Sequence, residues 1–169
     1  ATSRTFTTVE TGSTSGGRRF CGAATDGNGL VVMAPMRESS VGVFDPLSLA
    51  YSAVDISGVE NERDKYWGAT TAPSGVVVFA PWKAPTVGLF DAESLSFSVV
   101  DISALAPPLV QHGRFRGAAT TSFGVVVFAP HDTSVIGMFE PASRVFSTHE
   151  VGTGHAIGIN YAGAAATLD

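Results

Sequence analysis

The sequence predicts an all-β fold built from a repeated unit of four short strands. Short apolar runs rich in Val, Phe, Tyr, Ile and Thr alternate with clusters of Gly, Pro, Asp and Ser, which is typical of strands and turns. No window keeps a 3.6-residue hydrophobic period, so we expect almost no helix. The Ala-rich segments 22–25 and 163–167 could be mistaken for helix, but they align with residues 68–71 and are expected to be strands.

The first predicted strand of each unit begins with an aromatic residue, one variable residue and then a Gly-Ala pair. These aromatic residues are Phe20, Tyr66, Phe115 and Tyr161, at spacings of 46, 49 and 46 residues. The second strand repeats as Gly-Leu-Val-Val-Met-Ala-Pro at 29–35 and as Gly-Val-Val-Val-Phe-Ala-Pro at 75–81 and 124–130. The third strand ends in Phe-Asp or Phe-Glu at 44–45, 90–91 and 139–140, and the fourth strand covers 51–55, 97–101 and 146–150. We expect Phe44, Phe90 and Phe139 to be core residues.

Four antiparallel strands in a unit of this length are typical of a β-propeller blade. The small Gly-Ala-Ala-Thr strand suits the crowded central axis, and the Val-Val-Val-Phe strand suits a position buried between two blades. The Gly turn, apolar strand, polar loop and Phe-Asp strand of 75–91 resemble the repeats of kelch-, NHL- and YVTN-type propellers. This resemblance implies the propeller fold, which carries many unrelated functions.

Residues 1–169 are expected to form a single repeat domain. Its parts are 1–19 (last strand of a preceding blade plus a loop), 20–65, 66–114 and 115–160 (three blades), and 161–169 (first strand of a following blade). Residues 3–10 match 143–150 and supply the opening strand, so the count is fourteen strands, where a ring of four blades needs sixteen. Three alternatives stay open: a piece of a longer propeller, a ring completed by a partner chain, and a β-trefoil.

Composition excludes several function classes. Ten Lys and Arg face fifteen Asp and Glu, a net charge of −5, so generic binding to nucleic acid is not expected. The lone Cys21 excludes an internal disulfide and a Cys-rich zinc site. The chain lacks the run of about 18 apolar residues that a transmembrane helix requires, so we predict no transmembrane segment.

The loops that join the second to the third strand, and the fourth strand to the next unit, are expected on one face of the propeller. They differ between units, whereas the turns of the opposite face barely differ. Binding residues concentrate on loops held by a rigid scaffold, although neutral drift in exposed loops explains the same variation. The candidate binding residues are Met36, Arg37, Trp82, Lys83, Leu109, Gln111, His112, His131 and Asp132.

Trp82 allows two interpretations. An exposed Trp would anchor a partner or a sugar ring. Alternatively, Trp82 covers the edge of its own blade, as Met36 and His131 would at the equivalent positions. Trp67 aligns with Cys21 and Arg116, and we interpret it as a packing residue.

The acidic residues recur once per unit, which predicts that they cap turns and do not form a catalytic pair. They are Asp45, Asp91 and Glu140 after the third strand, and Glu10, Asp55, Asp101 and Glu150 after the fourth. The four histidines, His112, His131, His149 and His155, show no metal-binding spacing. We therefore predict no metal and no cofactor.

The sequence favours a non-catalytic protein–protein interaction or scaffold module that is part of a larger assembly. The expected partners are other protein subunits, or further blades of the same polypeptide, along residues 1–10 and 161–169. A lectin-like propeller that binds carbohydrate or another small ligand is the alternative. A propeller hydrolase or lactonase is less favoured, because the inner strands carry Gly, Ala and Thr where such enzymes place metal ligands or acids.

Overall fold

The computed structural model describes residues 7–12, 17–105, 113–151 and 161–166. Within them, twelve strands form three four-stranded antiparallel sheets, and no helix occurs. Blade 1 contains β1 (Phe20–Thr25), β2 (Val31–Pro35), β3 (Ser40–Asp45) and β4 (Ala50–Asp55). Blade 2 contains β5 (Tyr66–Thr71), β6 (Val77–Pro81), β7 (Thr86–Asp91) and β8 (Ser96–Asp101). Blade 3 contains β9 (Phe115–Thr120), β10 (Val126–Pro130), β11 (Val135–Glu140) and β12 (Val145–Glu150).

The three sheets are meanders with the same register. Ala23 pairs with Met33 in blade 1, and the equivalent pairs are Ala69 with Phe79 and Ala118 with Phe128. The predicted offsets of 46 and 49 residues between equivalent strands are therefore confirmed. The sheets are separate, so the fold is that of β-propeller blades and the trefoil alternative is wrong.

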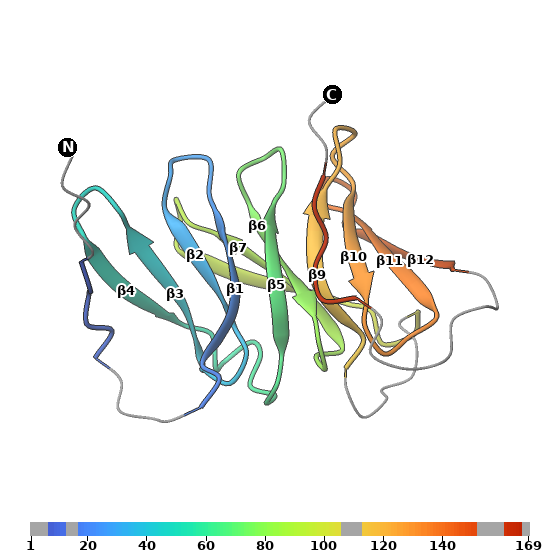
Figure 1. The fold of residues 1–169 in the computed structure, drawn as a ribbon, viewed down its shortest axis with the longest axis horizontal. Coiled ribbons are helices and arrows are strands. Elements are labelled where there is room, and N and C mark those ends of the chain that lie inside the picture. Colours follow the sequence, from blue (N-terminus) through green and yellow to red (C-terminus); the bar gives the residue numbers. More distant parts are fainter. Residues whose placement is uncertain (1–6, 13–16, 106–112, 152–160, 167–169) are drawn as a thin grey trace, which may run out of the picture.

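The blades stand side by side with the inner strands β1, β5 and β9 next to one another (Figure 1). A Cβ atom on Gly22 would lie 2.7 Å from the Cα of Gly68, and one on Gly68 would lie 3.0 Å from the Cα of Gly117. The Thr120 hydroxyl also donates to the Thr71 carbonyl at 2.8 Å, which links blade 3 to blade 2. Glycine recurs here because the inner strands approach too closely for a side chain.

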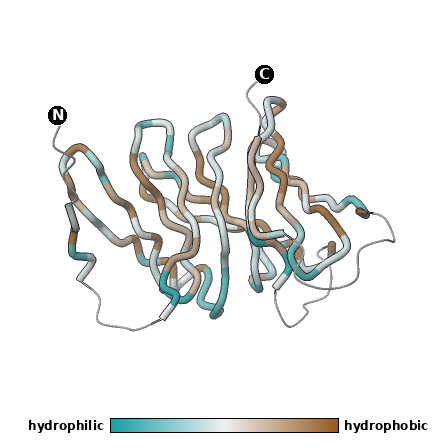
Figure 2. The backbone as a smooth tube through the Cα atoms, in the orientation of Figure 1, coloured by the Kyte–Doolittle hydropathy of each residue, from teal (hydrophilic) through white to brown (hydrophobic). Residues whose placement is uncertain are grey.

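The core lies between the blades. One cluster between blades 1 and 2 includes Val32, Val41, Tyr66, Phe79 and Phe90. A second cluster, between blades 2 and 3, includes Val78, Val87, Phe115, Phe128 and Phe139. Figure 2 shows the hydrophobic colour along the strands and the hydrophilic colour at the loops of the lower end.

Two expectations about exposure and strand count are corrected. Phe90 and Phe139 are fully buried as predicted, but Phe44 is only half-buried because its side of blade 1 has no neighbouring blade among the described residues. Residues 7–10 and 161–166 were expected in strands and form none, because a strand needs a hydrogen-bonded partner strand and neither segment pairs with one of the sheets. Residues 1–6 and 167–169, the rest of those terminal segments, lie outside the described residues.

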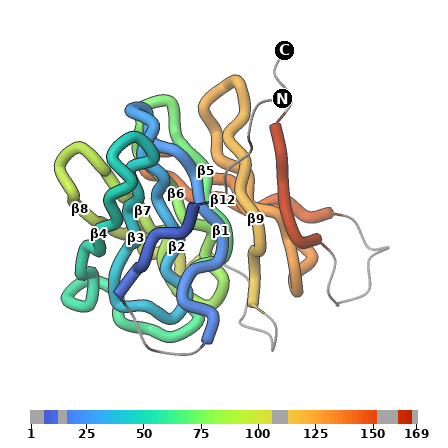
Figure 3. The backbone as a smooth tube through the Cα atoms, turned by 60° about the vertical axis from the view of Figure 1, so that its left-hand side comes forward, coloured from blue at the N-terminus to red at the C-terminus, as the bar shows by residue number. Residues whose placement is uncertain are grey.

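The C-terminal segment 161–166 nevertheless runs alongside β9 (Figure 3). A Cβ atom on Gly117 would lie 2.6 Å from the Cα of Gly163, so Gly163 continues the row formed by Gly22, Gly68 and Gly117. The segment 161–166 thus occupies the position next to β9 that β9 occupies next to β5 and that β5 occupies next to β1.

Candidate functional site

The candidate residues were expected on the loop face, which we define as the end of the blades that carries residues 36–39, 56–65, 82–85 and 131–134. A continuous series of backbone hydrogen bonds crosses this face from blade 1 to blade 3. In it, the residue after each second strand alternates with the residue before each first strand. The bonds are Met36 N to Arg19 O (2.9 Å), Lys65 N to Met36 O (2.9 Å), Trp82 N to Lys65 O (2.8 Å), Arg114 N to Trp82 O (2.8 Å) and His131 N to Arg114 O (2.8 Å). Because the backbone makes the connection, the side chains at these positions are free to differ between blades.

Trp82 is buried on the loop face, with 7% of its surface exposed. Its ring centroid lies 4.8 Å from that of Trp67 in the same blade and 4.7 Å from that of His131 in blade 3. A Cβ atom on Gly113 would come within 2.3 Å of the indole, so the chain entering blade 3 closes over it. The exposed-anchor interpretation is therefore wrong, because Trp82 is packed between Trp67 of its own blade and His131 of blade 3.

The other candidates are also held by local contacts. Met36, His131 and Asp132 are buried. Arg37 is exposed and its Nε donates to Asp64 at 2.7 Å, while the Lys83 ammonium lies 3.7 Å from the same carboxylate. The remaining three, Leu109, Gln111 and His112, fall outside the described residues.

The second residues of the inner strands, Cys21, Trp67 and Arg116, form a half-buried layer next to Met36, Trp82 and His131. The Cys21 sulfur lies 3.2 Å from the Met36 sulfur. Arg116 Nη1 lies 3.3 Å from His131 Nε2. The guanidinium carbon of Arg116 lies 4.2 Å from the centroid of Trp67, and that of Arg18 lies 5.2 Å from the same ring.

Electrostatics on this face do not favour a nucleophile. Burial raises the pKa of the Cys21 thiol, and the positive charges of Arg18, Arg116 and Arg37 only partly oppose that rise. A thiol with a raised pKa is protonated at neutral pH and reacts slowly. The pKa of Asp64 lies below its usual value. Burial acts to raise this pKa, but the hydrogen bond and positive charge of Arg37, together with the charge of Lys83, outweigh that effect.

Sequence reasoning missed a buried polar network between blades 1 and 2. The Thr86 hydroxyl donates to Glu60 at 2.7 Å and shares a hydrogen bond of 2.8 Å with the Tyr66 hydroxyl. Lys65 is buried and donates from Nζ to the Glu62 carbonyl at 3.0 Å. Burial lowers the pKa of Lys65 although four nearby carboxylates act in the opposite direction.

A signal for this network was present in the sequence. A cation precedes the aromatic residue of every complete first strand, at Arg19, Lys65 and Arg114. Lys65 and Arg114 are both buried, and Arg114 Nη1 donates to the Ala84 carbonyl at 3.0 Å. Lys65 and Arg114 thus each satisfy a backbone carbonyl group, whereas Arg19 pairs with the Glu38 carboxylate.

The recurring aspartates cap turns, as predicted. Asp45 accepts from the Leu47 backbone N–H at 2.8 Å and Asp91 from that of Glu93 at 2.9 Å. Asp55 and Asp101 accept in the same way from Ser57 (2.9 Å) and Ser103 (2.8 Å). In the part of the chain that the structure describes, no group of three or more His, Cys, Asp or Glu side chains could hold a metal ion.

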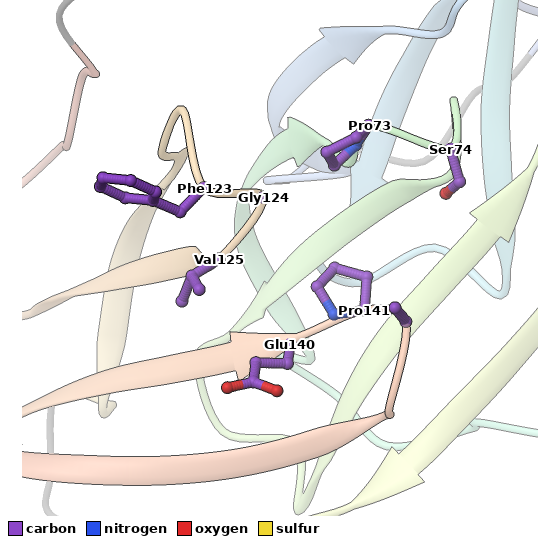
Figure 4. A pocket seen from close by; sticks show the side chains of 8 residues that line it. Pro73, Ser74, Phe123, Gly124, Val125, Glu140 and Pro141 are labelled. Carbon is purple, nitrogen blue, oxygen red and sulfur yellow. The ribbon is translucent and has the colours of Figure 1, made fainter.

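The opposite end of the blades, the turn face, holds a pocket of about 480 Å³ between blades 2 and 3 (Figure 4). It is lined by Pro73, Ser74, Phe123, Gly124, Val125, Glu140, Pro141 and Ala142. Phe123 is 92% exposed, and the Glu140 carboxylate accepts from the Ser143 hydroxyl at 3.0 Å. With one acid among its lining residues, the pocket lacks the pair that glycoside hydrolysis requires.

No family model matches the sequence, and no curated protein matches it. Solved structures are similar. The structure titled streptogramin B lyase matches with a TM-score of 0.64 and 12% identity, covering 82% of this chain and 42% of that one. A catalytically inactive variant of virginiamycin B lyase from Staphylococcus aureus with quinupristin matches at 0.63 and 14%, covering 82% and 43%. The extracellular domain of a hybrid two-component system from B. thetaiotaomicron matches at 0.56 and 8%, covering 76% and 16%.

The chain thus spans less than half the length of these structures, and their low identity shows a common fold alone. No helix in the described segments is long and apolar enough to cross a membrane. The chain has the β-propeller fold, in three four-stranded blades, and it shares that fold with enzymes and non-enzymes alike.

Proposed function

We propose that the chain is a non-catalytic protein-interaction module whose two outer blade faces pack against further four-stranded blades. A longer polypeptide or another subunit would supply those blades. The observation that carries the proposal is the difference in burial between blade 2 and its two neighbours.

The face of blade 1 that points away from blade 2 is apolar and partly bare. Val31, Met33 and Phe44 are half-buried on this face, whereas their equivalents in blade 2, Val77, Phe79 and Phe90, are completely buried. Equivalent positions in the repeat thus differ in burial according to whether a neighbouring blade covers them. Contiguous apolar surface of this kind usually marks an interface.

The outer face of blade 3 shows the same contrast. Val127, Ile136 and Met138 are half-buried, and the equivalent Val78, Val87 and Leu89 of blade 2 are buried. An open pocket of about 190 Å³ lies on this face between blade 3 and the segment that contains Tyr161 and Gly163. That segment stands where an inner strand of a next blade would stand, which is why we identify the occupant as a blade.

Sedimentation of the purified chain tests the proposal. We expect it to self-associate through the two apolar faces, and Ile136→Lys should reduce that association because it puts a charge on the outer face of blade 3. The control is Leu47→Lys, since Leu47 is 94% exposed on the β3–β4 turn of blade 1 and does not belong to the outer face of blade 3. A compact monomer with a cooperative melt, or equal effects of the two variants, would overturn the proposal.

The ligand-binding alternative loses its original basis. It depended on Trp82 as an exposed aromatic platform, and Trp82 is buried. The similarity to a lyase does not support an enzymatic role for this chain. At 12–14% identity, no catalytic residue of the lyase can be assigned to a position of this sequence.

A further inference from the structure

Two arginines far apart in the chain meet on the loop face at the indole ring of Trp67. Arg18 leads into β1, Trp67 lies on β5 and Arg116 lies on β9. Both guanidinium groups lie over or beside the one indole ring, at 5.2 Å for Arg18 and 4.2 Å for Arg116. A guanidinium at such a distance is attracted to the ring and held in place by it.

These two arginines carry no carboxylate partner within the described part of the chain. The ion pairs there join Arg19 to Glu38, and Arg37 and Lys83 to Asp64. The net charge of the whole chain is −5, so two arginines without a carboxylate partner on one ring form a local positive site in an acidic protein.

A third guanidinium, that of Arg37, has an electrostatic effect on the same layer. The charges of Arg18, Arg116 and Arg37 all act to lower the pKa of the Cys21 thiol, which belongs to the same layer and lies in blade 1. Arg37 is paired with Asp64, and the Asp64 charge opposes that of the three arginines at Cys21.

Guanidinium groups that lack a carboxylate partner suit a bound oxyanion, and among the described residues Arg116 has only the His131 ring nitrogen within hydrogen-bond distance. Their planar forks donate two parallel hydrogen bonds to a carboxylate or a phosphate. Trp67 is half-buried, so its indole keeps both guanidinium groups in position at the surface. The excess of acidic residues over the chain disfavours a long polyanion and favours a small ligand.

We propose that Arg18, Trp67 and Arg116 form a binding site for the oxyanion group, a carboxylate or a phosphate, of a small molecule. The site depends on blades 1, 2 and 3 together. It is independent of what covers the outer faces of blades 1 and 3.

Isothermal titration calorimetry with inorganic phosphate and with citrate tests the site. We expect saturable binding of at least one probe to the intact chain. Arg116→Gln and Arg18→Gln should each weaken it at least tenfold, and Arg116→Lys should weaken it less, because it keeps the charge and loses the fork. Thermal melts of each variant check that the blades remain folded.

The matched control is Arg63→Gln, because Arg63 is an exposed arginine of the same face. It should change the affinity less than twofold. Binding of phosphate alone or citrate alone supports the site and identifies the oxyanion. The absence of saturable binding for both probes would overturn the proposal, and so would an equal loss in the Arg63 and Arg116 variants, since that would indicate nonspecific attraction.

Discussion

The three blades closely resemble one another in sequence and in register. Blade 2, which lies between the other two, nevertheless differs from them in the burial of its side chains. Every residue of β6 is buried, whereas β2 and β10 each retain half-buried positions. The half-buried positions of β2 lie on the face opposite to that of β10, which is the pattern expected when one neighbour is lacking on each side. The comparison teaches that strand formation in this repeat is local, while core formation depends on the adjacent blade.

The largest expected change in the free energy of unfolding comes from Phe90→Ala, and the matched comparison is Phe44→Ala. Phe90 is fully buried between blades 1 and 2, so its truncation should cost about 3–5 kcal/mol of unfolding free energy. Phe44 occupies the same position of the repeat on an outer face, and its truncation should cost about 1–2 kcal/mol. Urea titration measures both values, and equal losses would show that neighbouring blades do not determine the core.

A smaller effect is expected along the row of glycines. Gly68→Ala would put a Cβ atom 3.0 Å from the backbone of Gly117, at a residue whose φ of +102° disfavours a side chain. We expect a loss of about 1–3 kcal/mol from this overpacking. Gly163→Ala is the matched control, because a Cβ atom there meets nothing within 4 Å. Unchanged stability of Gly68→Ala in the same urea titration would contradict close packing of the inner strands.

The smallest effect concerns turns that should not depend on the neighbouring blade at all. Hydrogen bonds from the Ser48 hydroxyl and the Leu47 N–H hold the pKa of Asp45 below 3.8, and bonds from Ser94 do the same for Asp91. A carboxyl group with a lowered folded-state pKa stabilises the fold above pH 3.8, and this contribution disappears as the pH falls through the folded-state pKa.

The melting temperature should therefore fall on acidification below that pH. Asp45→Asn in blade 1 and Asp91→Asn in blade 2 should flatten this dependence equally, because both aspartates cap exposed turns. Thermal melts at a series of acidic pH values measure the slope. A much larger change for Asp91 would show that the turns, like the core, depend on the covering blade.

The sequence by itself determined the features that repeat within each unit. The alternation of apolar and turn residues specified the strands, and the offsets of 46 and 49 residues specified their register. The aspartates that end the third and fourth strands indicated turn caps for the same reason, since a cap involves residues only two or three positions apart. Small residues on the inner strands indicated the close approach that the glycine row makes.

Only the tertiary structure decided which of these residues are covered and which meet across blades. Trp82 is buried because Gly113 and His131 pack against its ring. Phe44 is only half-buried because no blade among the described residues covers its side of blade 1. The convergence of Arg18, Trp67 and Arg116 joins residues about one repeat apart, which no local pattern specifies. Local periodicity sets the conformation of each strand, whereas packing between blades sets exposure and charge, because those depend on contacts between residues far apart in the chain.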